Sequence, residues 1–387
     1  AGVPALAAGL EANADDETRA LVAAYVAGVN SGLATLRLPP PEFLIARFRP
    51  RPWSEADVFG VGAVVAFDNG SNADNELLRL AIARALEDHD AGDGLELFLP
   101  DESRFDDRSY PLADLPALLD ALDATAQHRP TLAFGSNSWA VAPARADGDH
   151  ALLAADPHGQ WQLPGQLFEA HLFFDDDGRP AALRGWGAPG LPGMVYGFNE
   201  AIAWGFTSTG DAQDLYREER DRDNPELFRG RNGVYQPRSE TVEIPVRGRE
   251  TPHRFELLHT ENGPLYRDDP PLALAWSARE LDGLSLGGLF ALNRALDPDA
   301  IDAALDTFPA PSTRITWADV EGRIGSRVVG RLPLRGRGEG LIPLPGAQTD
   351  SAWQGFIAME LLPRVIDPPA GYVPGPMPGF NRRGSSR

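Results

Sequence analysis

Cysteine is absent from the 387-residue chain, which excludes disulfides, thiolate metal sites and a cysteine nucleophile. Long apolar runs are absent too: no stretch approaches about 18 consecutive apolar residues, so we expect no transmembrane helix and no membrane partner. The first residues lack a basic region followed by a long apolar core, and we expect no signal peptide within this chain. What is present, 43% hydrophobic and 24% charged residues, is ordinary for a globular protein.

Positive charge is also scarce. Lysine and arginine total 35 residues against 56 acidic ones, which gives a formal net charge of −21. Binding to phosphates needs a positive face, so the composition argues against a nucleic-acid partner. The chain lacks the H-E-x-x-H motif of zinc enzymes. A serine hydrolase with a Ser-His-Asp triad is a further alternative, which the chain's seven histidines leave open by count.

The pattern of apolar residues changes near residue 130. Before it, apolar positions recur every four residues from Leu21 to Val29, and Ser54 followed by Asp57 indicates the start of another helix. Further helices are expected over residues 77–86 and 113–127. After residue 130, short apolar runs between Gly, Pro and Asp clusters are typical of strands. The predicted strands are residues 138–141, 151–155, 167–174, 201–207 and 314–320.

Gly135 and Ser136 stand immediately before the first predicted strand, in the segment FGSNSWAV. Glycine permits an unusual backbone at the preceding peptide, where the hydroxyl of Ser136 can attack the carbonyl on its N-terminal side. Hydrolysis of the resulting ester would leave Ser136 as a new N-terminus. Its α-amine, with an ordinary pKa of about 8, would be the general base for its own hydroxyl. A simple turn is the alternative interpretation of Gly-Ser alone.

Longer motifs follow in a fixed order. From Ser136 onward these are GSNSWAV, LLAADPHGQWQLPG, GLPGMVYGFNEAIAWGFTST, DAQDLYREE, TENGPLY, RITWADVEGRIG, GRLPLR and DPPAGY. Upstream stand AGVNSGL, RPWSEADV and NADNELLR. In this order the motifs resemble the penicillin acylase family of N-terminal-nucleophile (Ntn) hydrolases, the first set matching the β-subunit and the second the end of the α-subunit. Its members include β-lactam acylases and acyl-homoserine-lactone acylases.

The resemblance implies an α+β fold, the Ntn-hydrolase four-layer α/β/β/α sandwich with a largely helical N-terminal segment. It divides the chain into residues 1–135, the end of the α-subunit with a linker, and residues 136–387, the start of the β-subunit. The implied function is a self-processing acylase that cleaves an acyl group from an amine through an acyl-enzyme on Ser136. Its partners would be a small-molecule acyl amide and its own α and β fragments, in the periplasm or outside the cell.

The resemblance also assigns roles near the nucleophile. Ser136 matches the catalytic serine, and Gly135 lies on the other side of the processing bond. His158 matches a position that often carries His or Gln, where it would orient the Ser136 amine or hydroxyl or tune processing; a structural histidine is the alternative. Thr209 matches a turn whose backbone N–H enters the oxyanion hole. Ser208 takes that place if the register shifts by one.

Two positions concern the acyl pocket. Tyr196 matches an aromatic residue of that pocket, with a plain core residue as the alternative. Gly159 stands where many relatives carry a bulky side chain. Its small size implies a pocket that has lost one wall and admits a longer or wider acyl group.

Three positions concern a metal ion. Asp211 and Asp214 match acidic residues that hold a structural calcium ion in many members, and Asn72 falls near a third ligand. A solvated acidic loop is the alternative. We expect Ca²⁺ as the cofactor and no organic cofactor.

The chain departs from the family at one catalytic position. The family supplies a side-chain Asn to the oxyanion hole shortly after the segment that matches DPPAGY. Here Met377 stands near that place and Asn381 comes too late. Roughly half of a full-length member is present, and one hypothesis is that the tail after Val373 reflects a truncated or frame-shifted gene. An inactive remnant, or a non-catalytic binding protein on the same scaffold, is therefore the alternative function.

Overall fold

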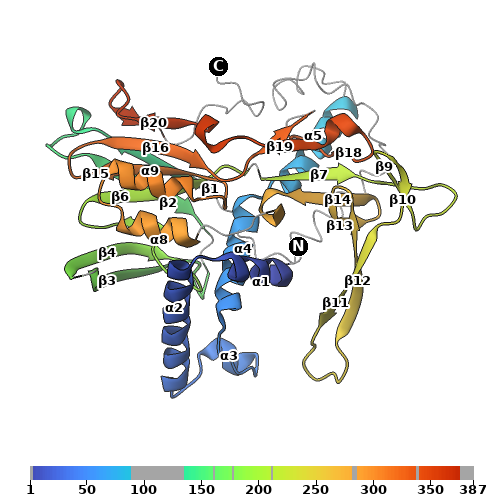
Figure 1. Cartoon of the computed structure of the whole chain (residues 1–387), viewed down its shortest axis with the longest axis horizontal. Coiled ribbons are helices and arrows are strands. Elements are labelled where there is room, and N and C mark those ends of the chain that lie inside the picture. Colours follow the sequence, from blue (N-terminus) through green and yellow to red (C-terminus); the bar gives the residue numbers. More distant parts are fainter. Residues whose placement is uncertain are drawn as a thin grey trace.

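The first part of the structure, a computed structural model, is helical (Figure 1). The structure describes residues 3–88, 135–159, 162–176, 178–210, 212–280, 286–336 and 340–374. The predicted helix at 113–127 lies outside these ranges. The helices before residue 89 are α1 (Val3–Asn13), α2 (Asp16–Thr35), α3 (Pro41–Ile45), α4 (Glu55–Asn69) and α5 (Ala73–Asp88).

Two of these helices begin at side-chain caps. Asp15 precedes α2 and accepts a hydrogen bond from the Thr18 N–H at 2.7 Å. At α4 the Ser54 N–H donates to Asp57 at 2.7 Å, which completes the predicted capping box. The periodic stretches at 21–29 and 77–86 lie inside α2 and α5, so these helix predictions are confirmed.

A seven-stranded antiparallel sheet forms the centre of the second part, in the order β20-β16-β15-β6-β5-β4-β3. A three-stranded sheet, β2-β1-β21, carries the predicted nucleophile. All five predicted strands are confirmed, since they fall within or at the edges of β1, β2, β3, β6 and β15. The bounds are β1 (Gly135–Val141), β2 (Leu152–His158), β3 (Phe168–Asp176), β4 (Arg179–Gly187), β5 (Tyr196–Phe198), β6 (Ile202–Ser208), β15 (Thr313–Asp319), β16 (Ile324–Val329), β20 (Arg364–Ile366) and β21 (Tyr372–Val373).

A six-stranded sheet, in the order β11-β12-β13-β14-β7-β18, lies beside the first two. Its strands are β7 (Gln213–Arg217), β11 (Arg238–Ile244), β12 (His253–Thr260), β13 (Gly263–Asp268), β14 (Pro271–Trp276) and β18 (Leu344–Pro345). Two small sheets are made by β8 (Glu219–Arg220), β9 (Phe228–Gly230) and β10 (Gly233–Tyr235), and by β17 (Pro333–Arg335) and β19 (Trp353–Phe356).

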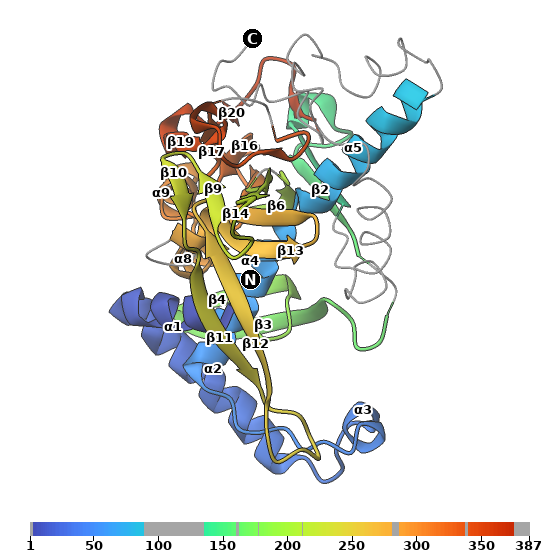
Figure 2. The same cartoon turned by 90° about the vertical axis from the view of Figure 1, so that its right-hand side faces the viewer.

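The hairpin of β11 and β12 projects from the body as a long ribbon, and its tip approaches the segment around α3 (Figure 2). There Arg247 donates to the carbonyl oxygen of Ala46. Within the described part of the chain, no helix is both long and apolar enough to cross a membrane.

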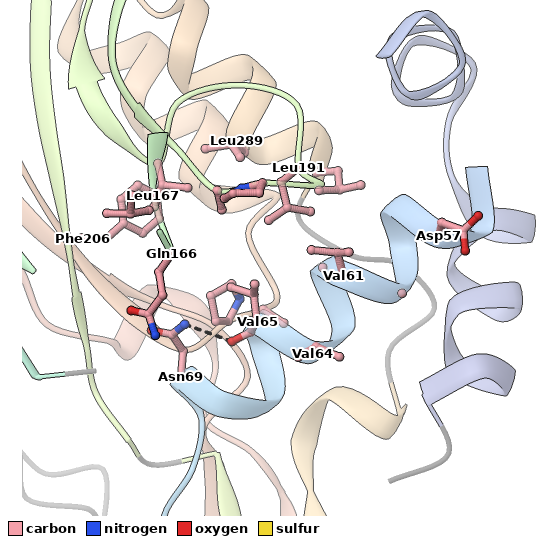
Figure 3. Close-up of a pocket in the computed structure, with 18 of the residues that line it drawn as sticks. Asp57, Val61, Val64, Val65, Asn69, Gln166, Leu167, Leu191, Phe206 and Leu289 are labelled. Carbon is pink, nitrogen blue, oxygen red and sulfur yellow. Dashed lines mark hydrogen bonds between the residues drawn. The ribbon is translucent and has the colours of Figure 1, made fainter. Parts of the chain in front are cut away.

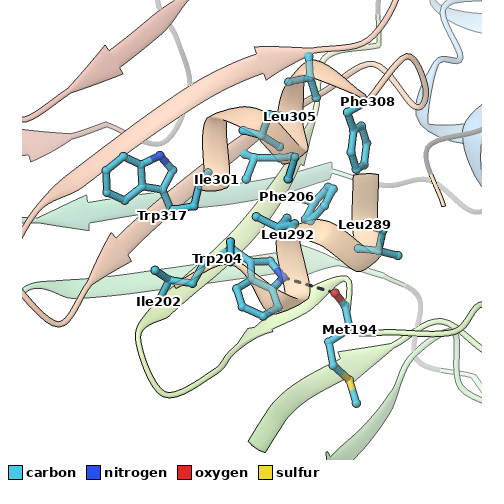
Figure 4. Close-up of a cluster of buried hydrophobic side chains, with 14 of the residues drawn as sticks. Met194, Ile202, Trp204, Phe206, Leu289, Leu292, Ile301, Leu305, Phe308 and Trp317 are labelled. Carbon is cyan, nitrogen blue, oxygen red and sulfur yellow. Dashed lines mark hydrogen bonds between the residues drawn. The ribbon is translucent and has the colours of Figure 1, made fainter. Parts of the chain in front are cut away.

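The main core lies between the seven-stranded sheet and the helices α8 (Leu286–Arg294) and α9 (Pro298–Asp306) (Figure 4). Trp204 on β6 is 1% exposed and donates its indole N–H to the Met194 carbonyl at 3.4 Å. Burying side chains of this size stabilises the fold by roughly 1.5–3 kcal/mol each. The large residues of this cluster are Met194, Ile202, Trp204, Phe206, Leu289, Leu292, Ile301, Leu305, Phe308, Ile315 and Trp317.

The β1 sheet packs on the opposite face of the seven-stranded sheet, so helices, large sheet and small sheet form successive layers (Figure 1). The two sheets approach closely at Gly205, where an added Cβ would lie 2.5 Å from the Cβ of Ala155. Buried hydroxyls join them: Ser138 Oγ lies 2.9 Å from Thr207 Oγ1 and 2.8 Å from Thr316 Oγ1. This tight stacking of β1 on β6 fixes the position of Ser136.

Candidate active site

Ser136 is the second residue of β1, next to the C-terminal end of β6. The Ser208 N–H at the end of β6 lies 3.4 Å from Ser136 Oγ. Ser208 is held in turn by its own hydroxyl, which donates to the Asn69 carbonyl at the end of α4 over 2.6 Å. Residues from both parts of the chain therefore meet at the predicted nucleophile.

The backbone donor at this site is Ser208, the alternative that the sequence left open for the oxyanion hole. Thr209 follows it directly, and its Oγ1 is buried without a hydrogen-bond partner among the described residues. An N–H directed at the serine oxygen lies close to where an oxyanion would form after attack, which is where a donor stabilises developing charge. The role of either residue stays a prediction.

His158 is the last residue of β2 and pairs with Gly135 in the antiparallel register. Its Nε2 lies 3.1 Å from both Asn137 Nδ2 and Asp156 Oδ2, and the ring is exposed. Strand pairing thus brings His158 beside the predicted processing bond, while its side chain contacts neighbours on the two strands. Its catalytic role stays a prediction.

A pocket of about 850 Å³ lies along one side of α4 (Figure 3). This volume is within the range of small-molecule sites. Val61, Val65 and Asn69 line it from the helix, with Asp57 at the far end. The wall opposite is mainly apolar and comes from the β-rich part of the chain: Leu167, Leu191, Tyr196, Phe206, Leu289 and Phe308.

One end of this pocket adjoins Ser136. Pro157, Thr313 and Asn69 all line the pocket. Pro157 pairs with Ser136 across the small sheet, and Thr313 pairs with Ser208 across the large one. Ser136 itself is not among the lining residues, but its strand partner is, so one end of the pocket comes close to the predicted nucleophile.

Tyr196 lines this pocket and packs edge-on against Phe206, with ring centroids 6.2 Å apart. Burial raises the pKa of Tyr196 to about 12, so its hydroxyl is neutral at ordinary pH. At Gly159 an added Cβ would lie 2.6 Å from Gln166 Oε1. Gln166 thus fills the space beside Gly159 and itself lines the pocket (Figure 3).

The predicted metal ligands lie beside an additional buried carboxylate. Asp211 falls outside the described residues. Asn72 and Asp214 are each 1% exposed, and Glu76, which is fully buried, accepts the Asn72 Nδ2 at 3.1 Å. Burial, with the nearby Asp214 carboxylate, raises the pKa of Glu76 above its ordinary value. Both carboxylate oxygens of Asp214 are engaged by Arg335, at 2.7 and 2.8 Å.

This donor set does not fit a calcium ion, which takes six to eight oxygen ligands. Asp214 presents its oxygens to a guanidinium. Asn72 donates its nitrogen to the carbonyl of Gly340, and its Oδ1 accepts a hydrogen bond from Arg79 Nη1 at 3.3 Å. In the described part of the chain no group of three or more His, Cys, Asp or Glu side chains is arranged to hold a metal. Calcium binding itself stays a prediction.

Three residues of these sites, Arg335, Gln166 and Asn69, were not found from the sequence. Arg335 gave no signal because its partner lies far away in the chain. Gln166 lies in a loop and Asn69 lies at the end of α4, and neither segment carries a motif of its own. The sequence did contain one usable hint, since a small residue at Gly159 leaves room for another side chain.

The fold belongs to the Ntn-hydrolase class. The structure of a thermostable penicillin G acylase from Alcaligenes faecalis superposes with a TM-score of 0.54 and 22% sequence identity, over 61% of this chain and 43% of that one. This similarity confirms the predicted fold class of N-terminal helices followed mostly by sheets.

The chain belongs to the penicillin amidase family, whose sequence profile matches residues 2–374. It is 30% identical over 386 residues to penicillin acylase 2 proenzyme of Pseudomonas sp., covering 92% of this chain and 47% of that protein. It is also 30% identical over 378 residues to acyl-homoserine lactone acylase QuiP of Pseudomonas fluorescens, covering 90% and 44%. The chain thus spans about half the length of these relatives.

Proposed function

We propose that this chain is part of a self-processing acylase that hydrolyses N-acyl amides at Ser136. The observation that carries this proposal is the mainly apolar pocket of about 850 Å³, which is lined by the strand partners of Ser136 and Ser208, while the Ser208 N–H lies 3.4 Å from Ser136 Oγ. An apolar acyl group in the pocket would place its carbonyl between nucleophile and donor. Membership of a family with penicillin and acyl-homoserine lactone acylases supports the same reaction.

Processing would begin with attack of Ser136 Oγ on the Gly135 carbonyl carbon. The peptide C–N bond breaks, the hydroxyl proton passes to the departing nitrogen, and Gly135 becomes an ester of Ser136. Water then hydrolyses this ester to a Gly135 carboxylate and a free Ser136 hydroxyl and amine. Both residues lie at the start of β1, and the relative named a proenzyme supports such a step.

Catalysis would use the amine that processing creates. This α-amine, with an ordinary pKa of about 8, accepts the Ser136 hydroxyl proton as Oγ attacks the substrate carbonyl. The proton then passes to the leaving amine, and the acyl group stays on Ser136 as an ester. Water, deprotonated by the same amine, releases the acid. The Ser208 N–H would stabilise the oxyanion in both halves, and one such donor is worth about 3–4 kcal/mol.

After processing the two fragments would stay associated through buried contacts. Helices α1, α2 and α4 share a hydrophobic cluster with Leu191, Leu286 and Phe290 from the second part. The small-molecule partner would be an N-acyl amide with a largely apolar acyl group. By analogy with the family, we expect the protein in the periplasm or outside the cell.

A panel of N-acyl amides with increasing acyl length tests this function, with released amine measured by a fluorogenic reagent. We expect release by the wild type and none by Ser136→Ala. The non-catalytic alternative predicts no release from any member of the panel, even from a soluble, folded and processed protein. That result would remove the acylase proposal.

A further inference from the structure

A buried ion pair joins β7 to the end of β17. Asp214 and Arg335 have side chains only 1% and 3% exposed. Arg335 Nε lies 2.7 Å from Asp214 Oδ2, and Arg335 Nη2 lies 2.8 Å from Oδ1. This is the two-pronged geometry in which a guanidinium matches a carboxylate most closely. Trp353 donates its indole N–H to the same Oδ2 at 2.6 Å.

The pair is connected to helix α5 through Gly340. The Asn72 side-chain nitrogen donates to the Gly340 carbonyl at 2.6 Å. Gly340 has φ +66°, and a Cβ there would lie 2.5 Å from Asp214 Oδ1 and 2.9 Å from Arg335 Nε. The backbone at Gly340 therefore packs directly against the ion pair, and a side chain at this position would displace Asp214 or Arg335.

Glu76 completes the junction from the helix side. Each of its carboxylate oxygens lies 3.2 Å from the Leu215 N–H, which follows Asp214 on β7. Glu76 and Asn72 belong to α5 and the turn before it, whereas Asp214 and Arg335 belong to the β-rich part. The polar cluster thus ties the helical part to the sheets at a place where no water-exposed surface screens the charges.

We propose that Arg335 supplies the positive charge that neutralises Asp214, with Arg79 close to Asn72 and Gly340, so that the stability of this junction does not depend on a divalent cation. A buried carboxylate needs a charged or hydrogen-bonding partner, and here the guanidinium and the Trp353 indole already provide it. Calcium would compete with both, because it binds through the same carboxylate oxygens. The inference concerns folding and does not rest on the proposed acylase function.

The test uses the full chain and two readouts, bound calcium by elemental analysis and the thermal midpoint Tm in calcium chloride or in excess EGTA. We expect no stoichiometric calcium and the same Tm in both conditions. A Tm that rises saturably with calcium, or one calcium per chain after dialysis, would overturn the proposal. Neither readout changes if Ser136 fails to cleave, so this result and the acylase result are separable.

Substitutions test directly whether the Arg335 guanidinium is the positive partner of Asp214. Arg335→Met strands the Asp214 carboxylate, and we expect Tm to fall by about 5 °C or more. Asp214→Asn combined with Arg335→Met removes the stranded charge and should have a higher Tm than Arg335→Met alone. Arg254→Met, which breaks the exposed pair with Glu243, is the control and should change Tm by about 1 °C or less. A double variant no more stable than Arg335→Met contradicts the role of Arg335.

If Arg335→Met does not fold, Arg335→Lys gives the same information. Lysine keeps the charge but loses the two-pronged geometry, so its Tm should fall without any gain in calcium response. A wild-type Tm that depends on calcium would still overturn the proposal without any variant.

Discussion

The backbone N–H of Ser208 is directed at the hydroxyl oxygen of Ser136, at an N···O distance of 3.4 Å. The two residues belong to different sheets, and hydrogen bonds among the hydroxyls of Ser138, Thr207 and Thr316 hold these sheets together just behind them. Nucleophile and donor are thus fixed relative to each other by the stacking of β1 on β6. The proposed chemistry depends on that stacking.

The hydroxyl of Ser208 positions this donor through the Asn69 carbonyl. Ser208→Ala keeps the N–H but loses the 2.6 Å hydrogen bond. We expect the rate of processing to fall about fivefold, because one such bond is worth about 1 kcal/mol. Thr209→Ala is the matched control, since that hydroxyl has no partner among the described residues. Equal rates for the two variants, measured by the loss of full-length chain, would contradict the role of the Asn69 contact.

The pocket along α4 should set the length of the acyl group. Val61→Phe narrows it about two helical turns away from Asn69. We expect kcat/KM for the longest accepted acyl chain to fall about tenfold, since each methylene group excluded from an apolar site costs about 0.8 kcal/mol. Short acyl chains should react as before, and Val61→Ala should retain the long ones. An equal loss of kcat/KM for acyl chains of every length would argue against this pocket as the acyl-binding site.

Asn293 supports the pocket wall formed by residues 190–195. Its Oδ1 accepts the Met194 N–H at 2.7 Å, and its Nδ2 donates to the Met194 carbonyl at 2.9 Å. Asn293→Ala leaves both buried groups without their partner, so we expect a loss of about 2–3 kcal/mol in the free energy of unfolding. Urea denaturation measures it. A loss below about 0.5 kcal/mol for Asn293→Ala would contradict the account.

The start of α4 should show a pH-dependent stability. The side-chain hydrogen bond from Arg51, with further bonds from Ser54, lowers the pKa of Asp57 to about 2. A lowered pKa means that the stabilisation is complete above the ordinary value of 3.8 and is lost as the pH falls toward 2.

Asp57→Asn should therefore lower the free energy of unfolding by about 1 kcal/mol at neutral pH. This difference from wild type should shrink below about pH 4. Chemical denaturation at a series of pH values measures this difference. Glu55→Gln removes the same charge from the same helical turn and is the control. A difference that stays constant from neutral pH to pH 2 would show that the Asp57 charge plays no part.

Local signals predicted much of the fold. The capping box at Ser54 and the period-four apolar pattern of α2 depend on neighbours within one or two turns, and both were confirmed. The strand at 314–320 was confirmed as β15, although it is buried on all sides and has no alternating pattern. The short length of this apolar run and the glycines and prolines that flank it were sufficient to predict a strand.

Contacts between distant segments were beyond the sequence. Nothing near Asp214 indicates that Arg335, more than a hundred residues later, neutralises it. The oxyanion register was left open between Ser208 and Thr209, because a one-residue choice in a turn depends on how two sheets stack. Family resemblance located Ser136, but only the structure shows a pocket lined by its strand partner Pro157.

The central claim is that Ser136 cuts the chain before itself, and intact-mass spectrometry of the purified protein tests it most directly. The account predicts two fragments in the wild type, residues 1–135 and 136–387, and a single uncut chain for Ser136→Ala. A soluble and folded wild type that stays as one uncut chain would contradict it.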